Sequence, residues 1–343
     1  MNRPSFARVG ALTGAGVLAL SACATPGGSV DNPSPGAGTP TTFTVGLTYT
    51  PDIQFAPFYV AAEQGYYDDA GLDVTLRHHG ASEGLFGAIE SGREDVVVAG
   101  GDEMLQARSQ GTPLLDVATL YQEYPVTAIV PDESDIRSAG DLAGRTVGVP
   151  GPFGETYFGL LALLDEAGLA EDDVRVEHIG YTQQAALTAG HVDAVMGFVN
   201  NDAVQFEAAG ESVRTIPIAE GDAPLVGIGL GVLDETAERE PEAVAALVEA
   251  TLRGVRDVIE DPEAAIEASS AHVPDLATEE QRAAARATLD ATVPLYGRQE
   301  EVGAQDPRTW RAMAELMDAH GLLAGPVPGG EAWTDEFLPS RTN

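Results

Sequence analysis

The chain of 343 residues contains no lysine, so its 18 basic residues are all arginine, against 54 acidic residues. Without lysine there is no side-chain amine for a Schiff base, which excludes pyridoxal phosphate attached to the protein. The formal net charge of −36 also excludes the clustered basic surface that nucleic acid requires. The same charge argues against lying flat on an anionic membrane. We therefore expect no nucleic-acid partner and no cofactor.

Cysteine occurs once, at Cys23, so the chain cannot form an internal disulfide. Cys23 follows two arginines and an apolar stretch, Val9 to Leu20, which is too short for a permanent membrane span but typical of a signal-peptide core. The residues just before the cysteine, Ser21 and Ala22, complete a sequence that resembles the bacterial lipobox. We predict a lipoprotein signal peptide at 1–22 and lipidation of Cys23; an ordinary secretory signal with a chance cysteine is the alternative.

The sequence predicts a tethered soluble domain on the outer face of the cell membrane. Residues 23–42 are rich in Pro, Gly, Ser and Thr, which cannot bury enough surface to fold, and form the expected tether. The rest is long enough for two lobes. We expect lobe 1 at 43–130 and 222–343, and lobe 2 at 131–221.

Short β-rich runs alternate with helical patterns, which predicts an α/β fold with largely parallel sheets. One order of parts occurs twice: a helix ends in Gly92 or Gly190, two residues follow, and Asp95 or Asp193 precedes a buried strand. The repeat favours two similar lobes, although any two βαβ units share some likeness. A further strand is expected from Pro224 to Val232. The expected helices, the last four packing around lobe 1, are Pro57–Gly65, Ser82–Glu90, Thr182–Ala189, Pro241–Glu260, Pro262–Ala271, Glu279–Ala291 and Pro307–His320.

Ligands of open parallel sheets bind beyond the carboxyl ends of the strands, so the segments after the predicted strands form the candidate site. Those segments hold much of the chain's Tyr, Phe, Asn and Gln, although aromatic residues make up only 6% of it. The candidate ligand-binding residues are Tyr49, Asp52, Gln54, Phe55, Asp102, Glu103, Tyr121, Gln122, Phe153, Glu155, Thr156, Tyr157, Tyr181, Gln183, Asn200 and Asn201.

Aromatic faces and amide side chains suit a flat, neutral heteroaromatic ligand, with a carboxylate such as Glu103 or Glu155 accepting from ring amino groups. Arginine occurs in none of these segments, which weighs against a phosphate, sulfonate or carboxylate ligand. Structural roles are the alternatives: Asp102 and Asp202 precede helices and fit helix caps, and Tyr121 fits a core position.

His78-His79 is the one pair that suggests a metal. Adjacent strand residues point to opposite faces and cannot easily hold one ion, so we expect no metal site. The sequence also has no Gly-x-Ser-x-Gly elbow and no phosphate loop ending in Gly-Lys.

Several motifs in order carry a family resemblance. Val45 to Pro51, Gly71 to Val74, Asp141 to Gly148 and Gly190 to Ala194 resemble ABC-importer binding proteins for thiamine precursors, which belong with sulfonate-binding and yeast thiamine-pyrimidine-synthase-like proteins. Other stretches look closer to riboflavin-binding lipoproteins: Pro51 to Tyr59, Tyr121 to Val126, Pro150 to Gly154 and Val199 to Asn201.

The resemblance implies a periplasmic-binding-protein type II fold, two doubly wound lobes joined by a hinge, and capture of a vitamin or its precursor for an ABC permease and ATPase. Riboflavin and a thiamine-pathway pyrimidine both remain open as ligand, and we expect a monomer. The alternative function is a secreted enzyme of pyrimidine or thiamine metabolism. Against it, Phe55 stands where the yeast-type synthase has a histidine, and the chain lacks that enzyme's lysine and its run of cysteines.

Overall fold

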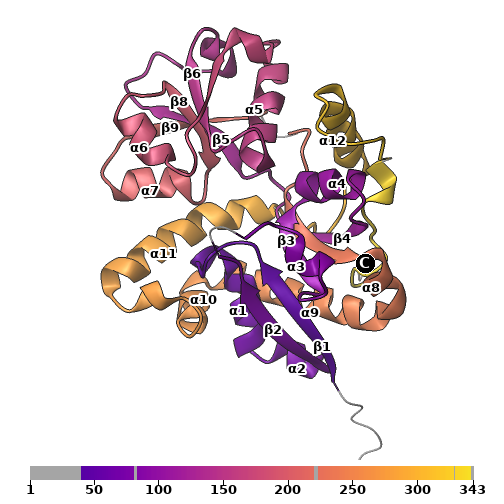
Figure 1. Ribbon diagram of the computed structural model, residues 1–343. Coiled ribbons are helices and arrows are strands. Elements are labelled where there is room, and N and C mark those ends of the chain that lie inside the picture. The colour runs from indigo at the N-terminus through magenta and orange to yellow at the C-terminus, as the bar shows by residue number, and fades with distance from the viewer. Residues whose placement is uncertain (1–39, 81–82, 220–222, 328, 341–343) are drawn as a thin grey trace, which may run out of the picture. The chain divides into compact units, whose positions relative to one another are not determined.

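A computed structural model describes residues 40–80, 83–219, 223–327 and 329–340, whose strands form two five-stranded sheets (Figure 1). The predicted signal peptide, Cys23 and most of the tether lie outside these residues. In the described ranges no helix combines the length and the apolar composition needed to cross a membrane. The first sheet, in spatial order, is β2 (Leu72–His78), β1 (Thr41–Leu47), β3 (Val96–Gly100), β10 (Ile228–Leu233) and β4 (Leu114–Thr119). The second is β7 (Arg175–His178), β6 (Thr146–Val149), β8 (Ala194–Phe198), β5 (Val126–Pro131) and β9 (Val213–Pro217).

In each sheet four strands run in the same direction, as expected, and one runs against its neighbours, so both sheets are mixed. β1 pairs in parallel with β2 and β3, but β10 runs antiparallel between β3 and β4. In the second sheet β5 is antiparallel to both β8 and β9. β5 and β10 are the strands by which the chain changes sheets, and each arrives through a loop without a crossover helix, so nothing forces the parallel direction. Because β5 pairs only in the second sheet, that sheet begins at Val126, ahead of the lobe boundary expected at residue 130.

The sequence repeat corresponds to the same structural device in each sheet. The Asp95 carboxylate accepts from the backbone N–H of Thr44 at 2.9 Å, and the Asp193 carboxylate accepts from that of Thr146 at 2.8 Å. Each aspartate thus ties the start of an inner strand to its parallel neighbour. The glycine three residues earlier in the chain, Gly92 or Gly190, has φ of 68° or 67°, the left-handed region that ends the preceding helix without a side-chain clash.

Helices lie beside both sheets (Figure 1). They are α1 (Ala56–Glu63), α2 (Tyr66–Asp69), α3 (Gly87–Glu90), α4 (Gly101–Ser109), α5 (Gly154–Glu166), α6 (Gln183–Thr188), α7 (Asp202–Ala208), α8 (Asp234–Arg239), α9 (Pro241–Glu260), α10 (Pro262–Ser269), α11 (Glu279–Thr292) and α12 (Pro307–Ala319), with short 3-10 turns that include η1 (Ile53–Phe55) and η5 (Val293–Tyr296). α3 has only four residues of the helix predicted over 82–90: residues 83–86 are not helical, since glycine at positions 84 and 87 disfavours a helix.

The first core lies between the first sheet and helices α1 and α9. Helix α9 begins at Pro241 and buries Val244, Leu247, Val248 and Val255 at spacings of three and four residues. Each such side chain stabilises the fold by about 2 kcal/mol. Gly254 lets α9 approach α1 closely, since a Cβ there would lie 2.1 Å from the carbonyl oxygen of Pro57.

α12 packs on α4, which follows β3 of the first sheet, and its apolar face belongs to a core cluster that continues into the second sheet. Its Trp310, Met313 and Met317 are fully buried in a cluster with Val126 and with Leu105 of α4. The helical spacing shows which face is apolar but does not show which sheet covers it.

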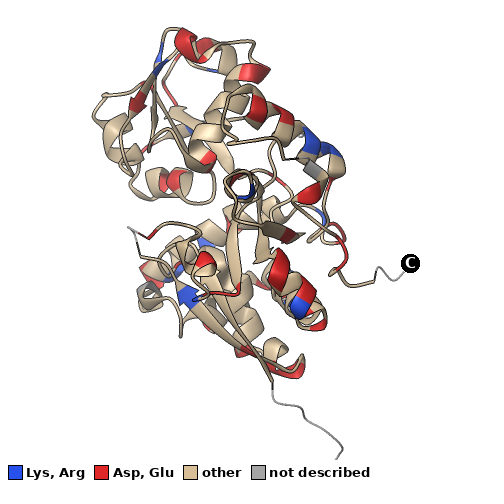
Figure 2. Ribbon diagram, turned by 45° about the vertical axis from the view of Figure 1, so that its right-hand side comes forward, with Lys and Arg blue, Asp and Glu red and all other residues tan. Residues whose placement is uncertain are grey.

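Acidic residues lie on most of the helices beside the two sheets, and arginines are sparse (Figure 2). Several of the arginines pair with nearby acids, as in the bidentate pair of Arg108 with Asp234 at 3.0 Å. The negative charge is therefore spread over the surface.

Candidate functional site

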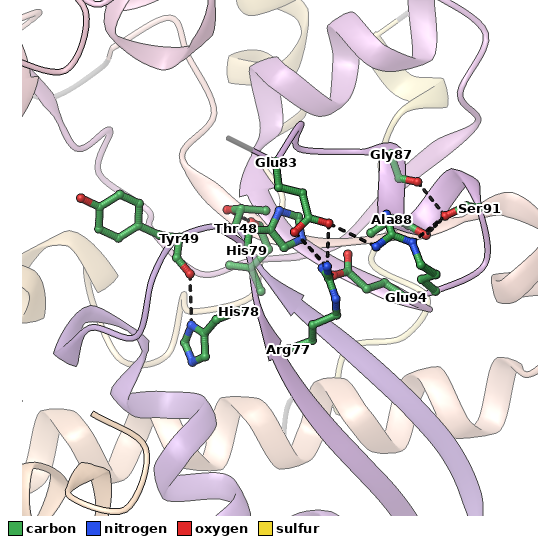
Figure 3. A network of polar contacts seen from close by, with 12 residues as sticks. Thr48, Tyr49, Arg77, His78, His79, Glu83, Gly87, Ala88, Ser91 and Glu94 are labelled. Atoms are coloured by element: carbon green, nitrogen blue, oxygen red, sulfur yellow. Dashed lines mark hydrogen bonds and ion pairs between the residues drawn. The ribbon is translucent and has the colours of Figure 1, made fainter. Parts of the chain in front are cut away.

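The segment after β1 is held by the histidine that ends β2. The Nδ1 of His78 lies 3.1 Å from the backbone carbonyl oxygen of Tyr49 (Figure 3). Its Nε2 lies 3.0 Å from the hydroxyl of Tyr59. A carbonyl can only accept, so Nδ1 carries the proton and Nε2 accepts from Tyr59. Burial lowers the pKa of His78, which favours this neutral form. The ring therefore fixes the Tyr49 backbone without adding charge.

A buried ionic network lies beside this histidine. Glu94, just before β3, accepts from His79 at 2.9 Å and from Arg77, which also pairs with Glu83 (Figure 3). Gly46 on β1 is needed for it, because a Cβ there would lie 2.1 Å from a carboxylate oxygen of Glu94. His78 and His79 thus serve different partners. Within the described ranges no three His, Cys, Asp or Glu side chains are grouped to hold a metal.

Three acidic side chains gather at the N-termini of α4 and α5. Asp102 is fully buried and accepts from the Tyr124 hydroxyl at 2.6 Å, and that hydroxyl also lies 3.0 Å from the backbone oxygen of Glu155. Gly154 lies next to Glu103, and Gly100 lies next to both Asp102 and Glu155, so the acids of the two helices meet. We call Asp102, Glu103 and Glu155 the acid trio.

The acid trio holds protons rather than charge. Burial raises the pKa of Asp102 to about 7. Burial, and then the charge of Asp102, raises the pKa of Glu103 to about 8. Burial, followed by the charges of Glu103 and Asp102, raises the pKa of Glu155 well above its usual range. Among the described residues none of the three forms an ion pair with arginine. Without an arginine these helix N-termini offer an anion no charged partner, and any of the three acids that ionises repels one.

A second cluster joins the ends of β4 and β8. Asn200, fully buried, donates from Nδ2 to the Tyr121 hydroxyl at 3.3 Å and to Oγ1 of Thr292 at 3.0 Å. Tyr121 in turn packs edge-on against Tyr296, with 5.5 Å between ring centroids. Burial raises the pKa of Tyr121, and the charges of Glu155 and Asp52 raise it further, which puts this phenol near acids of both sheets.

Tyr49 provides another link between the sheets. Burial raises its pKa, the charges of Asp52 and Asp202 add to this, and a hydrogen bond with Asn201 opposes it. Tyr49, Phe153 and Tyr181 are 47%, 51% and 77% exposed, and they are the large apolar side chains exposed within the described ranges. All three stand on segments that follow strands, where the sequence predicted aromatic ligand contacts.

Other predicted site residues have structural partners. Asp52 caps η1 by accepting from the N–H of Gln54 at 3.0 Å. Phe55 is buried against the His78 ring, with 5.7 Å between centroids. Gln122 donates to the backbone oxygens of Thr119 and Ala304. Tyr157 donates to Glu171 at 3.0 Å and so is drawn toward a surface turn. Thr156 and Gln183 are buried in the first turns of α5 and α6.

Sequence reasoning missed four residues at these clusters: His78 as a support for Tyr49, Tyr124 above the acid trio, and Thr292 and Tyr296 beside Tyr121. Tyr124 lies in a segment after a predicted strand, so the rule that selected the other candidates could have selected it too. Thr292 and Tyr296 lie where α11 passes into η5, and their sequence is that of any buried helix end.

Several known proteins resemble this chain in sequence. A family model described as NMT1/THI5 like matches residues 52–265. The riboflavin-binding protein RibY of Chloroflexus aurantiacus is 34% identical over 94% of this chain and 95% of its own. The formylaminopyrimidine-binding protein of Halalkalibacterium halodurans is 26% identical over 85% and 89%. The 4-amino-5-hydroxymethyl-2-methylpyrimidine phosphate synthase of Legionella pneumophila is 27% identical over 82% and 88%.

Solved structures share the fold. The alkanesulfonate-binding protein of Xanthomonas axonopodis pv. citri, bound to MOPS, aligns with a TM-score of 0.66 at 20% identity over 87% of this chain and 99% of its own. A Candida albicans protein with the generic periplasmic binding protein fold aligns with a TM-score of 0.61 at 15% identity over 86% and 96%. The predicted periplasmic-binding-protein type II fold is confirmed.

Proposed function

We propose that this chain, which belongs to the NMT1/THI5 like family, is a solute-binding protein that captures a planar, uncharged heteroaromatic molecule for an ABC importer. Riboflavin and a thiamine-pathway pyrimidine are the two ligands proposed. The 34% identity to a riboflavin-binding protein over 94% of the chain favours the flavin. The ligand lies among the segments that join the two sheets, where we place the sixteen candidate residues named from the sequence.

The observation that carries this proposal is the meeting of aromatic and amide side chains from both sheets. Tyr121 of the first sheet meets Asn200 of the second at 3.3 Å, and Asn201 of the second acts on the pKa of Tyr49 of the first. Aromatic faces stack on a flat ring, and carboxamides bond the donors and acceptors at its edge. Because the two halves come from different sheets, a ligand between them is fully bound only when the sheets close on it.

The acid trio supports an uncharged ligand over an anionic one. A sulfonate or phosphate at the start of α4 or α5 would face buried carboxyl groups with no described arginine to balance it. Protonated carboxyls donate hydrogen bonds, and ionised ones accept them, so the trio suits a ligand rich in ring nitrogens and carbonyls.

We propose that the chain performs no reaction on its ligand. Relatives include a pyrimidine phosphate synthase, so the family alone does not decide this. The chain has no lysine, and Phe55 occupies the place of that enzyme class's histidine. A turnover assay with candidate pyrimidines tests the enzymatic alternative.

We also propose that residues 1–22 are a lipoprotein signal peptide, that 23–42 tether the protein to the outer face of the membrane through lipid on Cys23, and that the partners are a permease and an ATPase. Mass spectrometry of the protein from membranes tests the anchor. A Cys23→Ser variant should appear in the soluble fraction.

The test of the ligand is a thermal-shift and calorimetric comparison of riboflavin, formylaminopyrimidine and a linear alkanesulfonate. Riboflavin or formylaminopyrimidine should raise the melting temperature and bind one per chain, with flavin fluorescence quenched by nearby tyrosine. Stabilisation by the sulfonate alone would refute the proposal.

A further inference from the structure

Two buried side chains that contact Tyr121 each have one polar atom without a hydrogen-bond partner among the described residues. Both protons of the Asn200 amide are used, one toward Tyr121 and one toward Thr292. The carboxamide oxygen of Asn200 and the hydroxyl of Tyr296 have no hydrogen-bond partner within the described residues. Asn200 is 0% exposed and Tyr296 is 1% exposed. A buried polar atom without a partner destabilises the fold, so native proteins rarely keep one that has no function.

The orientation of the Asn200 amide follows from its neighbours. The Thr292 hydroxyl donates to the backbone oxygen of Thr288 at 2.7 Å, so its oxygen is free only to accept. It therefore needs the NH₂ group of Asn200, not the oxygen. The carboxamide oxygen is left pointing elsewhere, as an acceptor.

The two atoms flank one side chain from different parts of the chain. Tyr296 packs edge-on against Tyr121, and Asn200 bonds the Tyr121 hydroxyl. Tyr121 also senses the charges of Asp52 and Glu155, which the sequence places in the ligand site. An amide from the second sheet and a tyrosine from η5, each with one unpartnered polar atom, thus contact the same side chain.

We infer that Tyr296 and Asn200 determine ligand specificity by recognising a ring that carries a carbonyl next to an N–H group, as in a lactam or imide. The Tyr296 hydroxyl donates to the ring carbonyl, and the Asn200 oxygen accepts from the ring N–H. This inference rests on the proposed function and narrows it to the flavin, whose ring has an imide edge. It adds Tyr296 and η5 to the site.

Riboflavin and 3-methylriboflavin test it by calorimetry, because the methyl group removes the imide N–H and leaves both carbonyls. The protein should bind riboflavin at least tenfold more tightly than the methylated flavin. Asn200→Ala should bind the two within about twofold of each other, since the acceptor is gone. Tyr296→Phe keeps the ring packing, should weaken both flavins by about tenfold, and should keep the preference.

Tyr67→Phe is the matched control, because it removes a buried hydroxyl that bonds Thr251 at 3.1 Å in the first core. It should leave both affinities unchanged, with melting temperatures recorded for every variant. Equal binding of the two flavins by the unmodified protein overturns the inference without any variant, as does an Asn200→Ala protein that keeps the full preference. Unchanged flavin affinity in Tyr296→Phe also overturns it. If the protein binds formylaminopyrimidine but not riboflavin, only this inference is refuted. If it binds neither compound, the proposed function is refuted as well.

Discussion

Replacing Glu103 with Gln removes one acid of the trio while keeping its shape and its acceptor oxygen toward the Gly100 N–H, 3.4 Å away. Burial and the charge of Asp102 raise the pKa of Glu103 from 4.5 to about 8. Folding therefore takes up a proton in this range. The stability that an acid with a raised pKa contributes is present below about pH 4.5 and is lost as the pH rises toward 8.

The size of the effect follows from the pKa shift. One proton taken up on folding lowers the free energy of unfolding by about 1.4 kcal/mol for each pH unit, or about 3 kcal/mol from pH 5 to pH 7. In the Glu103→Gln variant position 103 binds no proton, so this fall in the free energy of unfolding does not occur. The substitution also lowers the pKa of Glu155, because after burial the charge of Glu103 is the largest cause that raises it, and this acts in the same direction.

Urea denaturation at pH 5, 6, 7 and 8 measures the difference between the variant and the unmodified protein. That difference should grow by about 3 kcal/mol in favour of the variant between pH 5 and pH 7. Glu242→Gln, an exposed glutamate in the first turn of α9, controls for loss of one negative charge at a helix start. A difference that stays constant with pH would show that the trio ionises freely, and the argument from burial would be wrong.

Three further predictions concern separate parts of the molecule. Tyr49→Ala should weaken ligand binding by about tenfold, through lost stacking, and leave the melting temperature nearly unchanged because the phenol is 47% exposed; wild-type affinity in calorimetry would refute its place in the site. Gly254→Ala should lower the free energy of unfolding by about 2 kcal/mol, since the clash 2.1 Å from the Pro57 oxygen outweighs the gain of about 1 kcal/mol in helix propensity; Gly87→Ala, with nothing within 4 Å, is the denaturation control. His78 should appear in nitrogen NMR as the neutral Nδ1–H tautomer and titrate below the ordinary histidine pKa, so its contribution to stability is present above that pKa and lost as the pH falls; protonation at or above the ordinary value would contradict the assignment.

Elements whose signals are local were predicted well. α9 begins and ends where the sequence placed it, because Pro241 marks its first turn and one face repeats apolar residues for five turns. Asp95 and Asp193 were recognised as equivalent because glycine and aspartate stand at the same offset before a buried strand in each copy.

What the sequence left out depends on distant partners. Nothing in Ile228–Leu233 reveals that β10 runs antiparallel between β3 and β4, since direction depends on where the chain enters the sheet. Tyr296 meets Tyr121 across 175 residues of sequence, and its own neighbours give only the pattern of a buried helix end. The segments after the strands were predicted because ligands of α/β sheets bind beyond the carboxyl ends of strands. No such rule predicts the contribution of Thr292 and Tyr296.

The position of β10 sets an order of assembly. β4 pairs only with β10 in its sheet, and β10 is reached only after the whole of the second sheet has been made. A nascent or exported chain that emerges N-terminus first can finish residues 126–217 as a unit while β4 still lacks a neighbour. β1, β2 and β3 can pair with one another earlier, but the first sheet takes in β4 only after residue 233, so the sheet that is begun first is completed last.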